Sequence, residues 1–253
     1  MPLAAIRPRD VAAYVAQVSA DYAPATVVRD VSVLHAIFTS AKLEELVDSN
    51  PAERAERPKA SRRRWRILEP VEVARVAREL TDDQDRAAFL TLVLTGLRRH
   101  ELIALRWRDV ALAAGVLRVR DSKTEEGVRS IALAPRLAEA LWQHRRRSAF
   151  QGDDERVFHH PKTGGPFPPD KFREALNAAL ARAGITDYVR PFHDLRHTAI
   201  TNDAAAGSSA IAVMSKAGHA SMATTKRYLH LAGTVFSDEA DALERRLLGE
   251  VST

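Results

Sequence analysis

Four separated segments of the chain supply cations and proton carriers, the residue types from which a catalytic site can be built. The first is Thr95–Glu101, with the sequence TGLRRHE, and the second is Ser122–Thr124, with the sequence SKT. The third is His193–Thr198, with the sequence HDLRHT. The fourth begins with Gly218-His219 and reaches Tyr228 nine residues after the histidine.

Each of these residues also has an ordinary structural explanation. Arg98 could be a surface arginine at the start of a helix, and Lys123 a solvated turn residue. His193 and Arg196 lie three residues apart, on one face of a helix, where they could pair with acids. Tyr228 could be a half-buried core residue. Taken one at a time, the structural explanations are favoured; the order of the four segments is what argues against them.

Several other chemistries are excluded by their missing residues. The chain has no cysteine, so it has neither disulfides nor thiolate metal sites. His100-Glu101 begins like a zinc-protease helix, but Ala104 stands where the second histidine is needed. No phosphate-cradling glycine loop and no dinucleotide fingerprint is present, and His159-His160 are interpreted as surface residues. The sequence therefore predicts no cofactor and no metal site.

The four segments, in this order and spacing, resemble the signature of the tyrosine recombinases of the phage-integrase type. That signature is Thr-Gly-Leu-Arg with a following glutamate, a hairpin lysine, His-x-x-Arg-His-Thr, Gly-His, and a tyrosine nine residues later. The resemblance covers roughly residues 24–231. One departure is Ala217, which stands where the family usually has leucine before Gly-His; we expect it to change packing and not chemistry.

The resemblance implies an enzyme that cuts and rejoins DNA through a 3′-phosphotyrosyl intermediate, without metal ions or ATP. It makes Tyr228 the nucleophile. The other roles are phosphate stabilisation by Arg98, Arg196 and His219, proton acceptance by His193, proton donation by Lys123, and orientation of the arginine segment by Glu101. Two other readings stay open: a type IB topoisomerase, which uses a similar residue set, and a non-catalytic DNA-binding regulator, which has no need of Tyr228.

The charge distribution also points to nucleic acid. The chain has a formal charge of +5, and residues 53–66 alone carry seven cations and two acids, a surplus of five. We interpret this run as a DNA-contacting linker, although a solvated face is the alternative. Its cations are Arg54, Arg57, Lys59, Arg62, Arg63, Arg64 and Arg66.

The apolar periodicity predicts a mainly α protein with one small antiparallel β-sheet. Val27, Val31, Leu34, Phe38 and Ala41 mark an amphipathic helix, which a weaker helix over 11–18 precedes. Further helices are expected over 73–80, 87–95, 98–105, 137–147, 171–182, 193–206, 209–216, 222–231 and 236–248. Strands are expected over 116–120 and 128–133, joined by a hairpin turn. The helix over 87–95 is apolar on nearly all sides and should be central.

These elements suggest four parts. Residues 1–60 would form a shortened, helical core-binding domain, residues 61–68 a basic linker, residues 69–235 the catalytic domain and residues 236–253 a tail for subunit docking. The expected partners are double-stranded DNA, further copies of the chain in a tetrameric synapse, and an accessory directionality factor. The longest apolar stretch, residues 87–97, is too short to span a bilayer, and no signal peptide is visible. We therefore expect a cytoplasmic protein.

Overall fold

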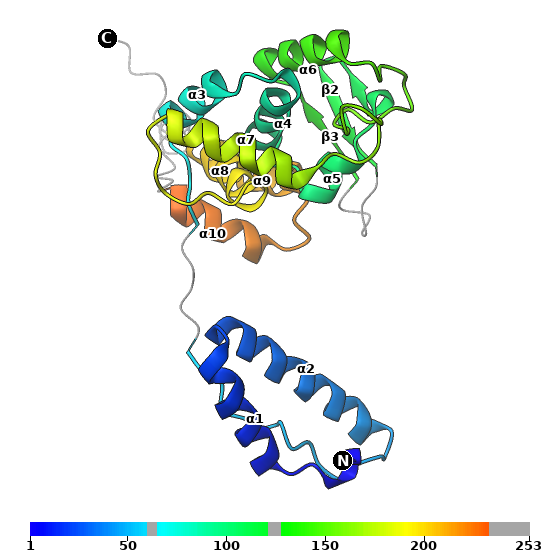
Figure 1. Ribbon diagram of the computed structural model, residues 1–253, viewed down its shortest axis with the longest axis vertical. Coiled ribbons are helices and arrows are strands. Elements are labelled where there is room, and N and C mark those ends of the chain that lie inside the picture. The colour runs from blue at the N-terminus through cyan, green and yellow to red at the C-terminus, as the bar shows by residue number, and fades with distance from the viewer. Residues whose placement is uncertain (60–64, 121–127, 233–253) are drawn as a thin grey trace, which may run out of the picture. The chain divides into compact units, whose positions relative to one another are not determined.

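The structure, a computed structural model, describes residues 1–59, 65–120 and 128–232. The chain divides into two compact units, Met1–Arg64 and Trp65–Thr253, each with its own core. Figure 1 traces both, with the first unit in blue. The expected hairpin turn with Lys123, the linker residues Arg62, Arg63 and Arg64, and the expected last helix over 236–248 lie outside the described residues.

The first unit is a pair of packed helices, α1 (Pro8–Asp21) and α2 (Pro24–Leu43), after a short 3-10 helix η1 (Leu3–Ala5). Proline occupies the first position of both α-helices, where its missing N–H costs nothing and its fixed φ favours the helix. The predicted amphipathic helix over 27–41 is confirmed as α2. Asn50 ties the following segment to this helix, because its side-chain amide donates to His35 O and Thr39 Oγ1, both at 3.0 Å.

The second unit contains most of the predicted helices. They are α3 (Pro70–Glu79), α4 (Asp83–Thr95), α5 (Arg99–Ala104), α6 (Pro135–Arg147), α7 (Pro169–Arg182), α8 (His193–Ala205), α9 (Ala210–Ala217) and α10 (Met222–Ala232). The mainly α prediction is therefore confirmed.

The sheet of this unit is antiparallel, as predicted, but has a third strand. Strand β2 (Val116–Val119) pairs with β3 (Arg129–Ala132), with Leu117 opposite Ile131. The added strand is β1 (Val110–Ala111), which follows the short 3-10 helix η2 (Trp107–Asp109) and pairs with the other side of β2. Two residues are too few to show the alternation by which a strand is read from sequence.

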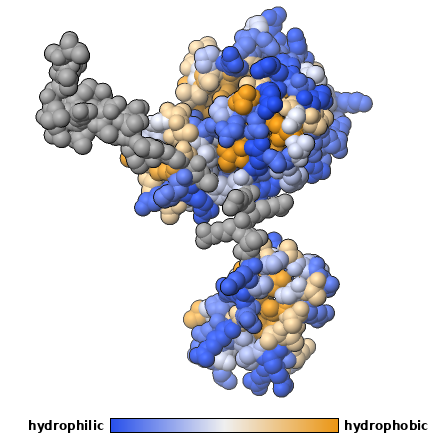
Figure 2. All heavy atoms as spheres, turned by 90° about the vertical axis from the view of Figure 1, so that its left-hand side faces the viewer, coloured by the Kyte–Doolittle hydropathy of each residue, from blue (hydrophilic) through white to orange (hydrophobic). Residues whose placement is uncertain are grey.

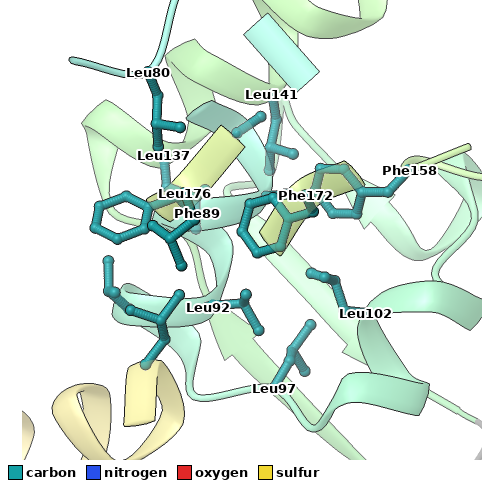
Figure 3. Close-up of a cluster of buried hydrophobic side chains, with 14 of the residues drawn as sticks. Leu80, Phe89, Leu92, Leu97, Leu102, Leu137, Leu141, Phe158, Phe172 and Leu176 are labelled. Carbon is teal, nitrogen blue, oxygen red and sulfur yellow. The ribbon is translucent and has the colours of Figure 1, made fainter. Parts of the chain in front are cut away.

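Helix α4 lies at the centre of the second unit, as its apolar character predicts. Phe89 and Leu92 are fully buried, and the helix packs against α6 and α8. Figure 3 shows these side chains among leucines and phenylalanines from α5, α6 and α7. This core holds α4 and α8 in place, and Arg98 follows the end of α4 while Arg196 projects from the first turn of α8.

One histidine lies where the sequence did not predict it. His159 was expected at the surface, but it is 4% exposed, so this prediction is wrong. Its Nε2 lies 2.8 Å from Ser148 Oγ, and the Phe150 ring packs edge-on against it at 4.8 Å. Burial of this ring is tolerated because both ring nitrogens have hydrogen-bond partners.

No helix in the described part of the chain is long and apolar enough to cross a membrane. The faces of the two units seen in Figure 2 are largely hydrophilic, with small hydrophobic patches between the polar residues.

Candidate active site

The turn between α4 and α5 presents Arg98. Gly96 ends α4 in the left-handed conformation, with φ of 66°, and its N–H donates to Leu92 O at 3.0 Å. Two residues later Arg98 precedes the first turn of α5, where its backbone N–H donates to Glu101 Oε2 at 2.7 Å. The Thr95–Glu101 motif is therefore a helix end followed directly by a helix start.

Glu101 is a buried carboxylate held between two arginines. Its Oε1 accepts from Arg98 Nη1 and from Arg129 Nη1, each at 2.9 Å, and its Oε2 accepts from Arg129 Nη2 at 3.0 Å. Burial by itself raises the pKa of Glu101, but the hydrogen bonds and positive charges of Arg129 and Arg98 outweigh it and lower the pKa to about 2. Glu101 is thus ionised at any working pH and orients both guanidinium groups.

Arg129 is a site residue that the sequence did not reveal. It opens β3, and only 6% of its side chain is exposed. A signal was present, because strand alternation puts Arg129 on the same face as the buried Ile131. An arginine on a buried face requires a carboxylate partner, and Glu101 is that partner.

Three arginines converge on the C-terminal end of α9. Arg129 Nε donates to Lys216 O at 2.7 Å, and Arg196 Nη2 donates to Ala217 O at 2.7 Å. Arg98 Nη2 donates to Gly218 O at 2.5 Å. The last carbonyls of a helix lack partners within the helix and carry partial negative charge, so they favour cations. The helix end therefore helps to hold like charges together.

Arg196 is the most enclosed of the candidate catalytic arginines. It projects from α8, is 9% exposed and also donates to Gly96 O. Burial, together with the nearby positive charge of Arg98, lowers the pKa of Arg196 to about 10, which still leaves it protonated at neutral pH. With Arg98, Arg129 and Arg196 against the single carboxylate of Glu101, the cluster has three positive charges and one negative, a surplus of two.

His219 lies directly after the glycine that ends α9. Its Nδ1 is 3.0 Å from Thr225 Oγ1, and the side chain is buried. Burial, and then the charges of Arg196, Arg98 and Arg129, lower the pKa of His219 to about 4. The ring is therefore neutral at neutral pH and can donate one hydrogen bond while accepting another.

Tyr228 projects from α10 into a group of aromatic rings and is 4% exposed. The His219 ring stacks against it with centroids 5.5 Å apart. Its hydroxyl Oη lies 2.8 Å from Nδ1 of His197, a residue to which the sequence assigned no role. Burial raises the pKa of Tyr228, although the charges of Arg196, Arg227 and Arg98 act in the opposite direction.

His193, the predicted proton acceptor, is the first residue of α8 and is exposed. Among the described residues, no hydrogen bond joins it to Tyr228, whose hydroxyl is bonded to His197 instead. The structure thus brings together Arg98, Glu101, Arg196, His219 and Tyr228. His193 lies at the start of α8, and among the described residues it has no hydrogen bond to the tyrosine hydroxyl.

The described residues of the predicted basic run differ in their surroundings. Arg54, Arg57 and Lys59 are exposed in the first unit. Arg66, in contrast, is held by acids of the second unit: its Nη2 lies 2.6 Å from Glu72 Oε1 and its Nε 2.9 Å from Asp187 Oδ2. Arg66 therefore anchors the chain where the second unit begins.

The described residues also contain no cluster of three or more histidine, aspartate or glutamate side chains placed to hold a metal ion. What the site does present is a set of guanidinium groups, which can bind phosphate oxygens through paired donors.

The curated proteins to which this chain is similar include DNA recombinases. The tyrosine recombinase XerC of Xanthomonas axonopodis pv. citri is 30% identical over 189 residues, covering 73% of this chain and 60% of the relative. The shufflon-specific DNA recombinase of Escherichia coli is 29% identical over 225 residues, covering 87% of this chain and 55% of the relative. The chain spans between 55% and 60% of the length of the first curated relatives it matches.

Solved structures share the fold. The Tn1549 transposon integrase in complex with a circular intermediate DNA superposes with a TM-score of 0.77 at 19% identity, covering 97% of this chain and 87% of that one. A lambda integrase dimer bound to a COC′ core site superposes with a TM-score of 0.72 at 22% identity, covering 90% of this chain and 81% of that one. The model of the phage integrase family matches residues 67–234, and this range includes every catalytic candidate named above. The chain belongs to the phage integrase family.

Proposed function

We propose that the protein is a site-specific DNA recombinase that cuts and rejoins strands through a covalent bond between DNA and Tyr228. The observation that carries this proposal is the arginine cluster beside the tyrosine. Its surplus of two positive charges, fixed by Glu101 and by the carbonyls at the end of α9, suits a phosphodiester whose negative charge grows during the reaction.

In the proposed reaction, Tyr228 Oη attacks the phosphorus and the bond from phosphorus to the 5′ oxygen breaks. The leaving oxygen takes a proton, for which Lys123 is the proposed donor, and the 3′ phosphate stays on the tyrosine. A 5′ hydroxyl from another strand then reverses the step. One phosphodiester replaces another, so the exchange needs no nucleotide cofactor.

Arg98 and Arg196 supply the charge that metal ions supply in many nucleases. Of the two, Arg98 is the more open, with 33% of its side chain exposed, and it can turn a donor toward an incoming phosphate. His219, which is neutral, can donate to a non-bridging oxygen. Two histidines are candidates for accepting the phenolic proton. The family resemblance suggests His193, whereas the hydrogen bond to Tyr228 Oη suggests His197.

The first prediction concerns the nucleophile. On a nicked suicide substrate, the unaltered protein should form a denaturation-resistant DNA adduct, and this adduct should persist in the presence of a chelator. Tyr228→Phe should form none while binding DNA nearly as well, because only the attacking oxygen is removed. The measurement is a denaturing gel beside a gel-shift titration.

Tyr188→Phe is the matched control, since Tyr188 is 62% exposed and is not one of the candidate catalytic residues. It should form the adduct at the normal rate. An adduct on Tyr228→Phe would rule out this nucleophile. Supercoil relaxation without exchange between two sites would instead indicate a topoisomerase.

We further propose double-stranded DNA as the partner, with the basic linker crossing its backbone. Copies of the chain would assemble on it as a tetrameric synapse through residues 236–253, and a directionality factor would set the outcome. The place of action would be the cytoplasm. Titration of half-sites and full sites, described below, tests the assembly.

A further inference from the structure

Trp65 is an aromatic side chain at the junction of the two units, and it stacks on two rings of the candidate active site. Its ring lies 3.8 Å from that of His197, at an interplanar angle of 9°. It also stacks on the Tyr228 ring at 5.2 Å. On Trp65 itself lies the guanidinium of Arg227, 5.5 Å from the ring centroid. We call this arrangement the Trp65 cover.

The residue that follows fixes the cover in place. Arg66 is bound by Glu72 and by Asp187, from two different segments of the second unit. Pairs of this kind are partly exposed and contribute modestly to stability, but they restrict where the backbone of Trp65 can lie. The cover is thus attached on one side to the catalytic unit and on the other to the linker.

Under the cover, the tyrosine hydroxyl already has a partner. Burial lowers the pKa of His197 to about 4, so its ring is neutral at neutral pH and Nδ1 can accept a hydrogen bond from Tyr228 Oη. In this arrangement the hydroxyl oxygen of Tyr228 is not accessible to a phosphate. Tyr228 is 4% exposed, and the rings of Trp65, His197 and His219 pack around it.

We propose that Trp65 and His197 are positioning residues that hold Tyr228 in a covered resting position, which opens when Trp65 moves away. This inference deepens the proposed function and rests on it for its biological meaning. Trp65 directly follows Arg62, Arg63 and Arg64 in the sequence. Binding of the linker arginines to DNA would therefore displace Trp65, the residue that covers the nucleophile.

The test is the reactivity of Tyr228 toward tetranitromethane in the absence of DNA, followed peptide by peptide with mass spectrometry. Tyr22 and Tyr188, 59% and 62% exposed, are internal references for an open phenol. In the unaltered protein, Tyr228 should be nitrated far more slowly than either. Trp65→Ala should raise its rate relative to Tyr188 by about tenfold or more, because an aromatic stack and the area it buries are lost.

Trp142→Ala is the matched control, because Trp142 is 45% exposed and also lies under an arginine, Arg146, at 4.6 Å. It should leave the nitration of Tyr228 unchanged. His197→Phe keeps the ring but removes the acceptor, and it should raise the rate about fivefold, the effect of losing one hydrogen bond. A cooperative thermal unfolding transition, followed by circular dichroism, shows that each variant is folded.

Three results would overturn the inference. One is nitration of Tyr228 in the unaltered protein as fast as that of Tyr188, and another is continued protection in Trp65→Ala. The third is a tenfold loss of adduct formation in Trp65→Ala with normal DNA binding, because Trp65 would then be needed during attack. The nitration results do not depend on strand cleavage, so a failure of the proposed function would be seen separately, as an unaltered protein that forms no adduct.

Discussion

At the scale of single residues, the site poses an electrostatic problem, since three guanidinium groups lie close together before any DNA is present. Glu101 offsets one of the charges, and the arginines in turn favour its ionised form and lower the pKa of its carboxyl. The carbonyls at the end of α9 offset part of the remainder. The cluster is therefore organised in advance, which is what an electrostatic contribution to catalysis requires.

Gly218 is the residue on which this arrangement most depends. It has φ of 63°, and a Cβ added there would lie 3.0 Å from Arg129 Nη1 and 3.2 Å from Arg98 Nη1. We predict that Gly218→Ala destabilises the protein by about 1–2 kcal/mol through its backbone conformation. It should also slow adduct formation by about 10²-fold, the usual loss when one transition-state donor is misplaced.

Gly115→Ala separates the two effects. Gly115 also has φ of 63°, but nothing lies within 4 Å of an added Cβ. It should show a similar loss of stability in thermal unfolding and normal adduct formation. Equal loss of activity in both variants would mean that the backbone strain, and not the arginine contacts, is responsible.

Residue identity and order led from the sequence to several residues that the structure places close together. Arg98, Glu101, Arg196, His219 and Tyr228 come together as the family resemblance implies. The sequence did not single out Arg129, Trp65 and His197, because their contacts with these residues join distant segments of the chain. A single arginine in a strand, or a tryptophan among linker arginines, has no spacing rule that reveals its partner.

At the scale of elements, helices were predictable because the apolar spacing and the prolines at helix starts agree. Proline stands at the start of α1, α2, α3, α6 and α7. Shorter elements were not all predictable: β1 is two residues long and is defined by its pairing with β2. The surface assignment of His159 failed for a related reason, since its burial follows from the packing of Phe150 and Ser148.

The linker is the element whose predicted role needs a direct test. Replacing Arg62, Arg63 and Arg64 with alanine should flatten the slope of log affinity against log salt by up to ~3 units, since each phosphate contact contributes about 0.9. The preferred DNA sequence should not change, because phosphate contacts carry no base information. Gel-shift titrations at several salt concentrations give the slope.

Arg145, Arg146 and Arg147 provide a matched control, as a second run of three arginines that lies on α6. Two of them are paired with acids, Arg145 with Asp153 and Arg147 with Asp83. Their replacement should leave the slope nearly unchanged. An unaltered slope in the linker variant would show that the linker cations are simply solvated.

At the scale of the whole molecule, the question is how copies of the chain meet on DNA. Phe236, Ala240, Leu243 and Leu247 form an apolar stripe in the sequence beyond α10, and such a stripe must be buried somewhere. We predict that truncation after Val235 preserves binding to a half-site but abolishes cooperative binding to a full site, and with it recombination. Gel-shift titration of half-sites and full sites is the measurement.

Leu243→Ala with Leu247→Ala should reproduce the truncation, whereas Arg245→Ala, off the stripe, should not. If the truncated chain still fills a full site cooperatively, the stripe packs against its own unit and the subunit interface lies elsewhere. The sequence could suggest this segment as an interface because of its periodicity. The sequence could not show whether the stripe is buried against its own unit or against a neighbouring copy of the chain, because both arrangements bury the same apolar area.

The contacts at the end of α9 also bear on which genetic changes this protein can accept. Arg98, Arg129 and Arg196 all bond to main-chain carbonyls of residues 216–218, and none of these bonds uses the side chain at the receiving position. A substitution such as the alanine at 217 therefore leaves the carbonyls available. Insertion or deletion of one residue in α9 would rotate them by about 100° around the helix axis. We therefore expect the number of residues in α9 to tolerate less change than the identity of its last side chains.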